Sequence, residues 1–315
     1  MRIFITGASG CIGHYVVDTL IKNSDHELFL MVRNPDRLHL DIGARPGIHC
    51  LQGDIREINK FADRLSTVDQ LIHIATSWGD PKESYEINVE KTLRLMSLLD
   101  PQRLRQVIYF STSSILGPQN RPLKAAGEIG TDYIRSKYIC YQRLGQLAIS
   151  PQITTLFPTL VFGGDGQKPY SHISGALPEV AQWIGLARFL QAEGSFHYIH
   201  AQDIATVVRY LVEHPPAADG PRDIVLGGEA MTVNQAIEET SRYFGQRIYF
   251  RLPLSARLTQ LLIKVFNVRV AEWDRFCIQH RHFTYQNPVS PAKLGLTNYC
   301  STLADLFRAG DVAPR

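Results

Sequence analysis

A tyrosine and a lysine stand four residues apart in the chain, at Tyr133 and Lys137. In a helix this spacing places the two side chains on one face, one turn apart. An ammonium near a phenol favours the phenolate, because a unit charge at about 4 Å is worth on the order of 4 kcal/mol at an intermediate dielectric. That energy corresponds to a tyrosine pKa near 7 instead of about 10. The pair therefore predicts proton transfer near neutral pH, with Tyr133 as the general acid or base.

A row of hydroxyl groups follows the apolar run at residues 107–110. Ser111, Thr112 and Ser113 stand at the end of this expected strand. Hydroxyls there can hydrogen-bond a substrate carbonyl or alcohol. Taken alone, serine clusters at strand ends are usually turns, and a Tyr-x-x-x-Lys string often occurs by chance.

A glycine array follows the first apolar run of the chain. Residues 6–13 read Thr-Gly-Ala-Ser-Gly-Cys-Ile-Gly, between a strand-like and an amphipathic segment. Glycines permit a tight turn and a close approach of backbone to pyrophosphate, while a helix N-terminus offers free N–H groups. The alternative is a plain glycine-rich turn. The array predicts a dinucleotide site made by Thr6, Gly7, Ser9, Gly10, Cys11, Ile12 and Gly13.

Arg33 ends the second apolar run, where an NAD enzyme usually places a carboxylate for the ribose 2′-hydroxyl. A guanidinium suits a 2′-phosphate instead, so NADP(H) is the preferred cofactor, with NAD(H) possible. Asp54 and Ile55 follow the third run, where the carboxylate of Asp54 can accept from the adenine amino group. Asp54 could equally cap the helix that follows.

These residues need a framework, and short apolar runs separated by helix-length segments supply it. Strands apolar on both faces belong in a parallel sheet covered by helices. The expected strands are Ile3–Ile5, Leu28–Val32, Ile48–Leu51, Gln70–Ile74, Val107–Phe110 and Thr154–Phe157, and the expected helices are Cys11–Ile21, Ser84–Leu99 and Thr131–Ala148. The sequence thus predicts an α/β fold, a Rossmann-type doubly wound parallel sheet with a smaller, interleaved C-terminal substrate lobe.

The regular alternation fails after Pro158, where irregular loops and helices run to about Leu190. A helix at Tyr198–Val212 and a strand at Asp223–Leu226 then return to the sheet. We therefore expect residues 1–157 and 198–228 to form the NADP-binding Rossmann domain. Residues 158–197 and 229–315 form the substrate-binding lobe.

Together these segments resemble the extended short-chain dehydrogenase/reductase family, which includes nucleotide-sugar epimerases and dehydratases, dihydroflavonol reductases and 3β-hydroxysteroid dehydrogenases. The resemblance spans nearly the whole chain. Beside the phosphate loop at 6–13, the hydroxyl row at 107–117 and the Tyr/Lys pair, it includes residues 73–76, 88–92, 157–163 and 198–205.

The resemblance implies a role for each matching residue. Tyr133 is the acid/base, and Lys137 orients the nicotinamide ribose and tunes Tyr133. Thr112, five residues before Gly117, is the substrate-binding hydroxyl, with Ser111 or Ser113 as alternatives. Tyr133 and Lys137 also belong to the expected cofactor site, together with Ala75, Thr76 and Pro158.

Two aromatic residues depart from the family pattern. Phe157 and Phe196 stand where sugar-nucleotide enzymes often place arginines, and Arg188 and Lys168 are the remaining candidates for binding a substrate phosphate. We therefore expect hydride transfer to or from the carbonyl or secondary alcohol of a small, largely apolar substrate. The alternatives are a nucleotide-sugar epimerase or dehydratase with tightly held NAD(P), and a non-catalytic NADP-sensing or assembly factor.

Composition sets the remaining expectations. The formal net charge of +3 over 315 residues does not favour a nucleic-acid partner. Five scattered cysteines, no leader-like N-terminus and no membrane-length apolar run indicate a cytoplasmic protein without integral membrane association. No metal site is expected, since His280 and His282 lack further ligands nearby in sequence. We expect a monomer or a homodimer, the latter formed by helices 84–99 and 131–148.

Two features keep two interpretations each. Trp78 either lines the nicotinamide end of the cleft or shields the core. The apolar stripe of Ser255–Phe266 either packs on the protein or touches a membrane surface or a lipid-like substrate.

Overall fold

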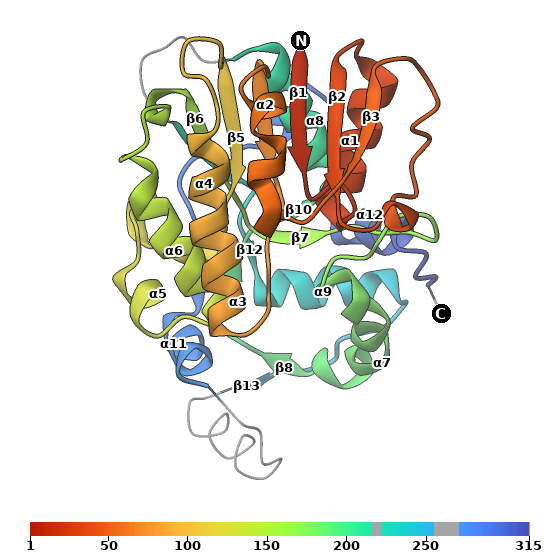
Figure 1. The fold of residues 1–315 in the computed structure, drawn as a ribbon. Helices are drawn as coiled ribbons and strands as arrows, with labels where there is room; N and C mark the ends of the chain where they lie inside the picture. Colours follow the sequence, from red (N-terminus) through yellow and green to blue (C-terminus); the bar gives the residue numbers. More distant parts are fainter. Residues whose placement is uncertain (216–221, 255–270, 315) are drawn as a thin grey trace.

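One seven-stranded sheet organises the computed structural model, which describes residues 1–215, 222–254 and 271–314 (Figure 1). Its strands are β1 (Arg2–Thr6), β2 (Glu27–Val32), β3 (Ile48–Gln52), β4 (Gln70–His73), β5 (Gln106–Phe110), β6 (Ile153–Pro158) and β11 (Arg222–Leu226). Their order is β11-β6-β5-β4-β1-β2-β3, and all neighbouring pairs are parallel. The predicted Rossmann-type sheet is confirmed. Its order reverses between β1 and β4, and sheets of this kind bind ligands at that point, beyond the carboxyl ends of the strands.

Successive side chains of each strand point to opposite faces of the sheet, and each face has its own hydrophobic core. Ile3 and Ile5 of β1 pack on one face with α1 (Cys11–Asn23) and α8 (Ala201–Glu213). Phe4 between them packs on the other face with α4 (Thr92–Ser97) and α6 (Asp132–Leu144). The period of two in a strand makes this division, and it explains why the strands are apolar on both faces.

The other described helices are shorter or lie outside these two layers. They are α2 (Ala62–Leu65), α3 (Pro81–Tyr85), α5 (Lys124–Glu128), α7 (Leu177–Ala187), α9 (Val233–Tyr243), α11 (Glu272–His280) and α12 (Leu303–Ala309). Helices α7, α9 and α12 lie beyond the carboxyl edge of the sheet (Figure 1) and contribute to a third apolar cluster.

Three small sheets accompany that third cluster. Strand β7 (Leu160–Phe162) pairs with β10 (Tyr198–His200), and β8 (Leu190–Gln191) pairs with β13 (Leu252–Pro253). Strand β9 (Ser195–Phe196) lies between β12 (Met231–Thr232) and β14 (His282–Phe283). Strands β8 and β9 of the segment 158–197 thus pair with strands β12, β13 and β14 of the later part of the chain. The division into two interleaved domains at the predicted boundaries stays a prediction.

Some element boundaries differ from those expected. Residues Tyr198–His200 form a strand, so the helix begins at Ala201, and the helix expected to reach Ala148 ends at Leu144. Strand β7 was not expected at all. Strands β7 and β10 pair across nearly forty residues of chain, and such pairing leaves little local signal in a three-residue strand.

The helix expected at Ser84–Leu99 is instead composite. Helix α3 continues into a π-helical segment, Glu86–Lys91, which leads into α4. π-helical turns often occur at functional sites, where they turn a side chain out of the regular helical register.

The segment Ser255–Phe266 lies outside the described residues. Within the described part of the chain, no helix has the length and apolar character needed to cross a membrane.

Candidate active site

The glycine array forms the turn between β1 and α1. Gly7 has φ +78°, and a Cβ there would lie 2.6 Å from the backbone nitrogen of Ala75. A Cβ on Gly13 would lie 2.0 Å from the Gly7 carbonyl oxygen. At Gly10, the helix N-cap, the nearest atom would be 3.5 Å away. Gly7 and Gly13 therefore permit close backbone packing, and Gly10 opens the helix whose N-terminus can receive the pyrophosphate of a dinucleotide.

These contacts predict opposite results for two similar substitutions. Gly13→Ala should lower the free energy of unfolding by about 1–3 kcal/mol or more, because its Cβ overlaps backbone that cannot move independently. Gly10→Ala, with ordinary contacts, should stay within about 1 kcal/mol of wild type. Denaturant unfolding of the two variants measures the difference, and equal stabilities would disprove this packing.

A chain of buried hydrogen bonds holds the phosphate loop between β1 and α1 in place. His73 Nδ1 lies 2.7 Å from Thr6 Oγ1, and its Nε2 lies 2.8 Å from Thr92 Oγ1. Burial lowers the pKa of His73 to about 3, so the ring is neutral and carries one N–H. Because Thr92 Oγ1 donates to Ile87 O and Thr6 Oγ1 accepts from Ala75 N, the proton is assigned to Nε2. The fully buried Thr6 side chain thus supports the phosphate loop from beneath.

The residues expected at the adenosine end differ in their exposure. Arg33 is exposed directly after β2, and its carbonyl accepts from Gln52 Nε2 at 3.5 Å. Asp54 caps the helical segment Ile55–Phe61 by accepting from Arg56 N at 2.8 Å, and it also pairs with the Arg56 guanidinium. The Ile55 side chain is buried in the core, so only its backbone is available to a ligand. Asp54 therefore acts as a helix cap in this structure, which was the alternative to a contact with adenine.

Tyr133 and Lys137 lie on α6, as the spacing predicted. Lys137 is 2% exposed and donates to Phe110 O at 2.8 Å, and its Nζ lies 6.0 Å from the centre of the Tyr133 ring. Burial lowers the pKa of Lys137 to about 8. Burial also raises the pKa of Tyr133 above its usual value, although a side-chain hydrogen bond with Thr112 partly opposes this rise.

The expectation that Lys137 brings the pKa of Tyr133 near 7 is therefore wrong in this structure. Burial of the phenol raises its pKa, and the Lys137 ammonium is directed at the Phe110 carbonyl. Tyr133 is thus protonated at neutral pH, a state suited to donating a proton rather than accepting one.

The hydroxyl row follows β5 directly. Thr112 makes the side-chain hydrogen bond with Tyr133, and its Oγ1 also lies 3.3 Å from Ser114 Oγ. Ser111 Oγ is buried without a hydrogen-bond partner among the described residues, and Ser113 is also buried. Contact with the phenol favours Thr112 as the substrate hydroxyl.

The remaining expected cofactor contacts lie at the same edge of the sheet. Ala75 and Thr76 lie in the loop after β4, where the backbone of Ala75 is close to Gly7 of the phosphate loop. Pro158 is the last residue of β6 and is buried. Since β4 and β6 flank β5 in the sheet, these residues lie on either side of the hydroxyl row.

Sequence reasoning gave no site role to Asn88, which lies in the π-helical segment. Its Oδ1 accepts from Thr76 Oγ1 and Ser77 N, and its Nδ2 donates to Ser77 O and to Ser136 Oγ at 2.9 Å. Ser136 lies between Tyr133 and Lys137 on α6 and donates to Tyr133 O. A buried asparagine therefore ties the loop after β4 to the catalytic helix. Its position in the matching stretch at 88–92 was the available signal.

The two aromatic departures differ in their surroundings. Phe157 is fully buried and packs edge-on against Tyr141, with ring centres 5.4 Å apart, so it gives no support to the apolar substrate expected from its position. It lies within β6 and points into the core, as alternating strand residues must. Phe196 is partly exposed, in β9.

The two cations considered for phosphate binding are already engaged. Lys168 Nζ lies 3.5 Å from Asp18 Oδ2, and its side chain is 17% exposed. Arg188 Nη1 donates to Gln246 Oε1 at 2.6 Å, and its guanidinium covers the Phe189 ring. Both would have to exchange protein partners to bind a substrate phosphate.

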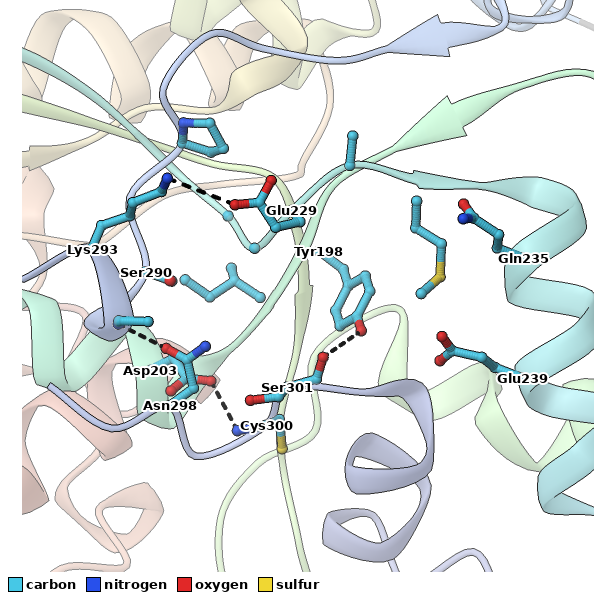
Figure 2. A pocket seen from close by; sticks show the side chains of 17 residues that line it. Tyr198, Asp203, Glu229, Gln235, Glu239, Ser290, Lys293, Asn298, Cys300 and Ser301 are labelled. Carbon is cyan, nitrogen blue, oxygen red and sulfur yellow. Dashed lines mark hydrogen bonds and ion pairs between the residues drawn. The ribbon is translucent and has the colours of Figure 1, made fainter. Parts of the chain in front are cut away.

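A cavity of about 530 Å³ lies elsewhere, beyond the carboxyl end of β11 (Figure 2), and none of the predicted site residues lines it. Its lining includes Asp203, Glu229 and Glu239 beside Lys293, which pairs with Glu229 at 3.7 Å. Asp203 accepts from the backbone nitrogens of Tyr299 and Cys300, and burial raises its pKa to about 6. This excess of carboxylates disfavours a dinucleotide phosphate, so the loop between β1 and α1 stays the candidate cofactor site.

No group of three or more potential metal ligands occurs in residues 1–215, 222–254 and 271–314.

The sequence matches the family described as NAD dependent epimerase/dehydratase over residues 3–227, well over half of the chain. The chain belongs to this family. It is 26% identical over 249 residues to sterol demethylase protein B of Methylococcus capsulatus, covering 76% of this chain and 73% of that protein. It is 26% identical over 288 residues to a UDP-glucose 4-epimerase of Yersinia enterocolitica, covering 79% and 84%. The crystal structure of gox2253 shares the fold, with a TM-score of 0.69, 20% identity and 99% of both chains covered.

Membership of the epimerase/dehydratase family makes this protein an NAD(P)-dependent enzyme and confirms the resemblance to extended short-chain dehydrogenases/reductases. The nicotinamide cofactor fits the residues present, since the cradle of Gly7 and Gly13 brings backbone close to a helix N-terminus.

Proposed function

We propose that this protein reduces the carbonyl group of a small, largely apolar substrate with NADPH, or oxidises the corresponding secondary alcohol. The carrying observation is a protonated Tyr133, hydrogen-bonded to Thr112 and one helical turn from a buried lysine, at the carboxyl edge of the sheet. A carbonyl oxygen between Thr112 and Tyr133 would accept from both hydroxyls.

In reduction, Tyr133 Oη donates its proton to that oxygen as negative charge develops there, and the phenol regains a proton from solvent. Thr112 Oγ1 holds the oxygen in place. Lys137, positively charged below a pH of about 8, stabilises the phenolate formed during proton transfer. When bound, nicotinamide supplies the hydride that completes the reduction. The glycine loop, Arg33 and Lys137 are the groups proposed to hold this cofactor.

The preference for NADP(H) rests on Arg33. This exposed guanidinium follows β2, next to the phosphate loop of β1, and a fork of N–H donors suits a 2′-phosphate. We expect NADPH to bind about tenfold to hundredfold more tightly than NADH. Arg33→Asp should remove this preference.

Titration of both cofactors against wild type and Arg33→Asp measures the effect. Arg37→Asp, which makes the same charge change at a neighbouring exposed position, is the matched control and should shift affinity by less than about threefold. Equal affinities of wild type for NADPH and NADH would overturn the assignment.

The second candidate is a nucleotide-sugar epimerase, favoured by the similarity to the Yersinia enzyme along most of both chains. It would use the same tyrosine and lysine with a dinucleotide that stays bound. Against it, the two cations considered for this role, Lys168 and Arg188, are held by protein partners in the described part of the chain. The similarity to a sterol demethylase protein supports the first proposal, a largely apolar substrate.

Competition between the two substrate classes tests the proposal. UDP-, GDP- and dTDP-sugars are compared with alicyclic and aromatic ketones by thermal shift, with NADP present. We expect ketones to raise the melting temperature. Stabilisation by a sugar nucleotide alone would reverse the order of the two candidates.

A further inference from the structure

Trp78 places an exposed indole directly over the catalytic tyrosine. Its ring centre lies 3.7 Å from that of Tyr133, with the two planes 12° apart. The same indole lies 4.9 Å from the ring of His172, inclined at 54°. Yet Trp78 is 58% exposed, so it does not shield the core. A large apolar side chain left this open beside a reactive group is positioned to contact something else.

The backbone on both sides of Trp78 is held in place. Ser77 makes two hydrogen bonds with the buried Asn88, through its N–H at 2.8 Å and its carbonyl at 2.9 Å. Gly79 N donates to Ser77 Oγ at 3.0 Å, and Gly79 O accepts from Ser84 Oγ at 3.0 Å. These hydrogen bonds fix the position of the backbone that carries the indole.

The same framework also holds the tyrosine. Asn88 donates to Ser136 Oγ, and Ser136 donates to the carbonyl of Tyr133. One buried asparagine thus sets the distance between the loop of Trp78 and the helix of Tyr133. The backbones that carry the two stacked rings are thus tied to a common residue.

His172 contacts the indole of Trp78 from a segment outside the parallel sheet. It is exposed, and it lies in the segment between β7 and α7, outside the parallel sheet. Two aromatic rings from segments almost a hundred residues apart therefore meet, and one of them stacks on the ring of Tyr133. Flat π-faces attract flat apolar surface by dispersion and shape, and such contacts add to the gain from burial.

We propose that Trp78 and His172 form the wall of a substrate subsite that selects flat, uncharged ring ketones over small acyclic ones. The inference rests on the proposed carbonyl reduction and adds the shape of the substrate to it. A ring ketone whose oxygen reaches Tyr133 and Thr112 would lie with its body along the indole. An acyclic ketone as small as acetone covers little of that surface, and a charged pyrophosphate gains nothing from it.

The test compares kcat/KM for acetone, cyclohexanone and 1-tetralone, with NADPH as reductant. In wild type we expect the ratio of 1-tetralone to acetone to be high. Trp78→Ala should lower that ratio at least about tenfold, since it removes both the stacking contact and the buried area. Trp78→Phe, which keeps a ring, should retain most of it, and His172→Leu should lower it less than Trp78→Ala does.

Trp183→Ala is the matched control. Trp183 is 64% exposed, slightly more than Trp78, and lies on α7. Its removal should leave the ratio unchanged. An equal fall in Trp183→Ala, or an unchanged ratio in Trp78→Ala, would overturn the subsite.

Binding provides a second readout that does not need turnover. Saturable quenching of tryptophan emission by 1-tetralone, in the NADP⁺ complex, should occur in wild type and be lost in Trp78→Phe. Quenching that persists in this variant contradicts the subsite. Undiminished turnover in Tyr133→Phe would instead contradict the proposed reduction, so the two failures are distinguishable.

Discussion

Turnover in Tyr133→Phe should fall by about 10²- to 10⁴-fold, the usual contribution of a positioned general acid. The phenyl ring keeps the contact with Trp78, whose ring centre lies 3.7 Å away, so the site should otherwise be preserved. NADPH affinity should stay within about threefold of wild type, because the change removes one hydroxyl. Single-turnover reduction and a cofactor titration measure the two quantities.

Tyr138→Phe is the matched control for this prediction. Tyr138 lies on the same helix, one residue beyond Lys137, and packs in an apolar cluster. Its hydroxyl has no role in the proposed chemistry, so turnover should remain within about twofold of wild type. Comparable losses in the two variants would mean that Tyr133 is not the acid.

Lys137→Met should stabilise the protein while damaging its function. Burial lowers the pKa of Lys137 from 10.5 to about 8, so the folded protein holds this ammonium at a cost. The shift corresponds to a cost on the order of 3 kcal/mol below pH 8, and methionine of similar length would avoid it. Turnover and NADPH affinity should both fall at least about tenfold, because the ribose contact and the charge are lost.

The pH dependence of this effect has a definite sign. A lysine whose folded pKa lies below its unfolded pKa destabilises the fold at low pH, and the cost disappears as pH rises from about 8 to 10.5. The stability gap between Lys137→Met and wild type should therefore be widest near pH 7 and close toward pH 10.5. Urea unfolding of both proteins across this range measures it. A wild type more stable than the variant at pH 7 would contradict the stated cost.

Local patterns in the sequence predicted the parts of the site that depend on spacing along the chain. The glycine array had to follow a strand and open a helix, and Gly7 and Gly13 do so with contacts that exclude a Cβ. Tyr133 and Lys137 had to share a helix face, which needs only a regular helix. The apolar runs identified the parallel sheet, because runs that are apolar on both faces are also a local pattern along the chain.

Features that depend on distant contacts were not predictable in this way. The rise in the pKa of Tyr133 comes from burial under the assembled fold, which no spacing of residues reports. Phe157 stands where related enzymes often have an arginine, but its side chain points into the core, because strand register decides the direction of a side chain. The meeting of Trp78 with His172 joins two segments whose separation in sequence carries no pattern.

Transfer of deuterium from [4-²H]NADPH to a ring ketone such as 1-tetralone tests the central claim most directly. The account predicts deuterium on the carbinol carbon of the alcohol, with one NADP⁺ released for each alcohol formed, and transfer slowed at least about a hundredfold in Tyr133→Phe. Conversion of a nucleotide sugar to its epimer without accumulation of oxidised cofactor, and with no label in any ketone product, would contradict it.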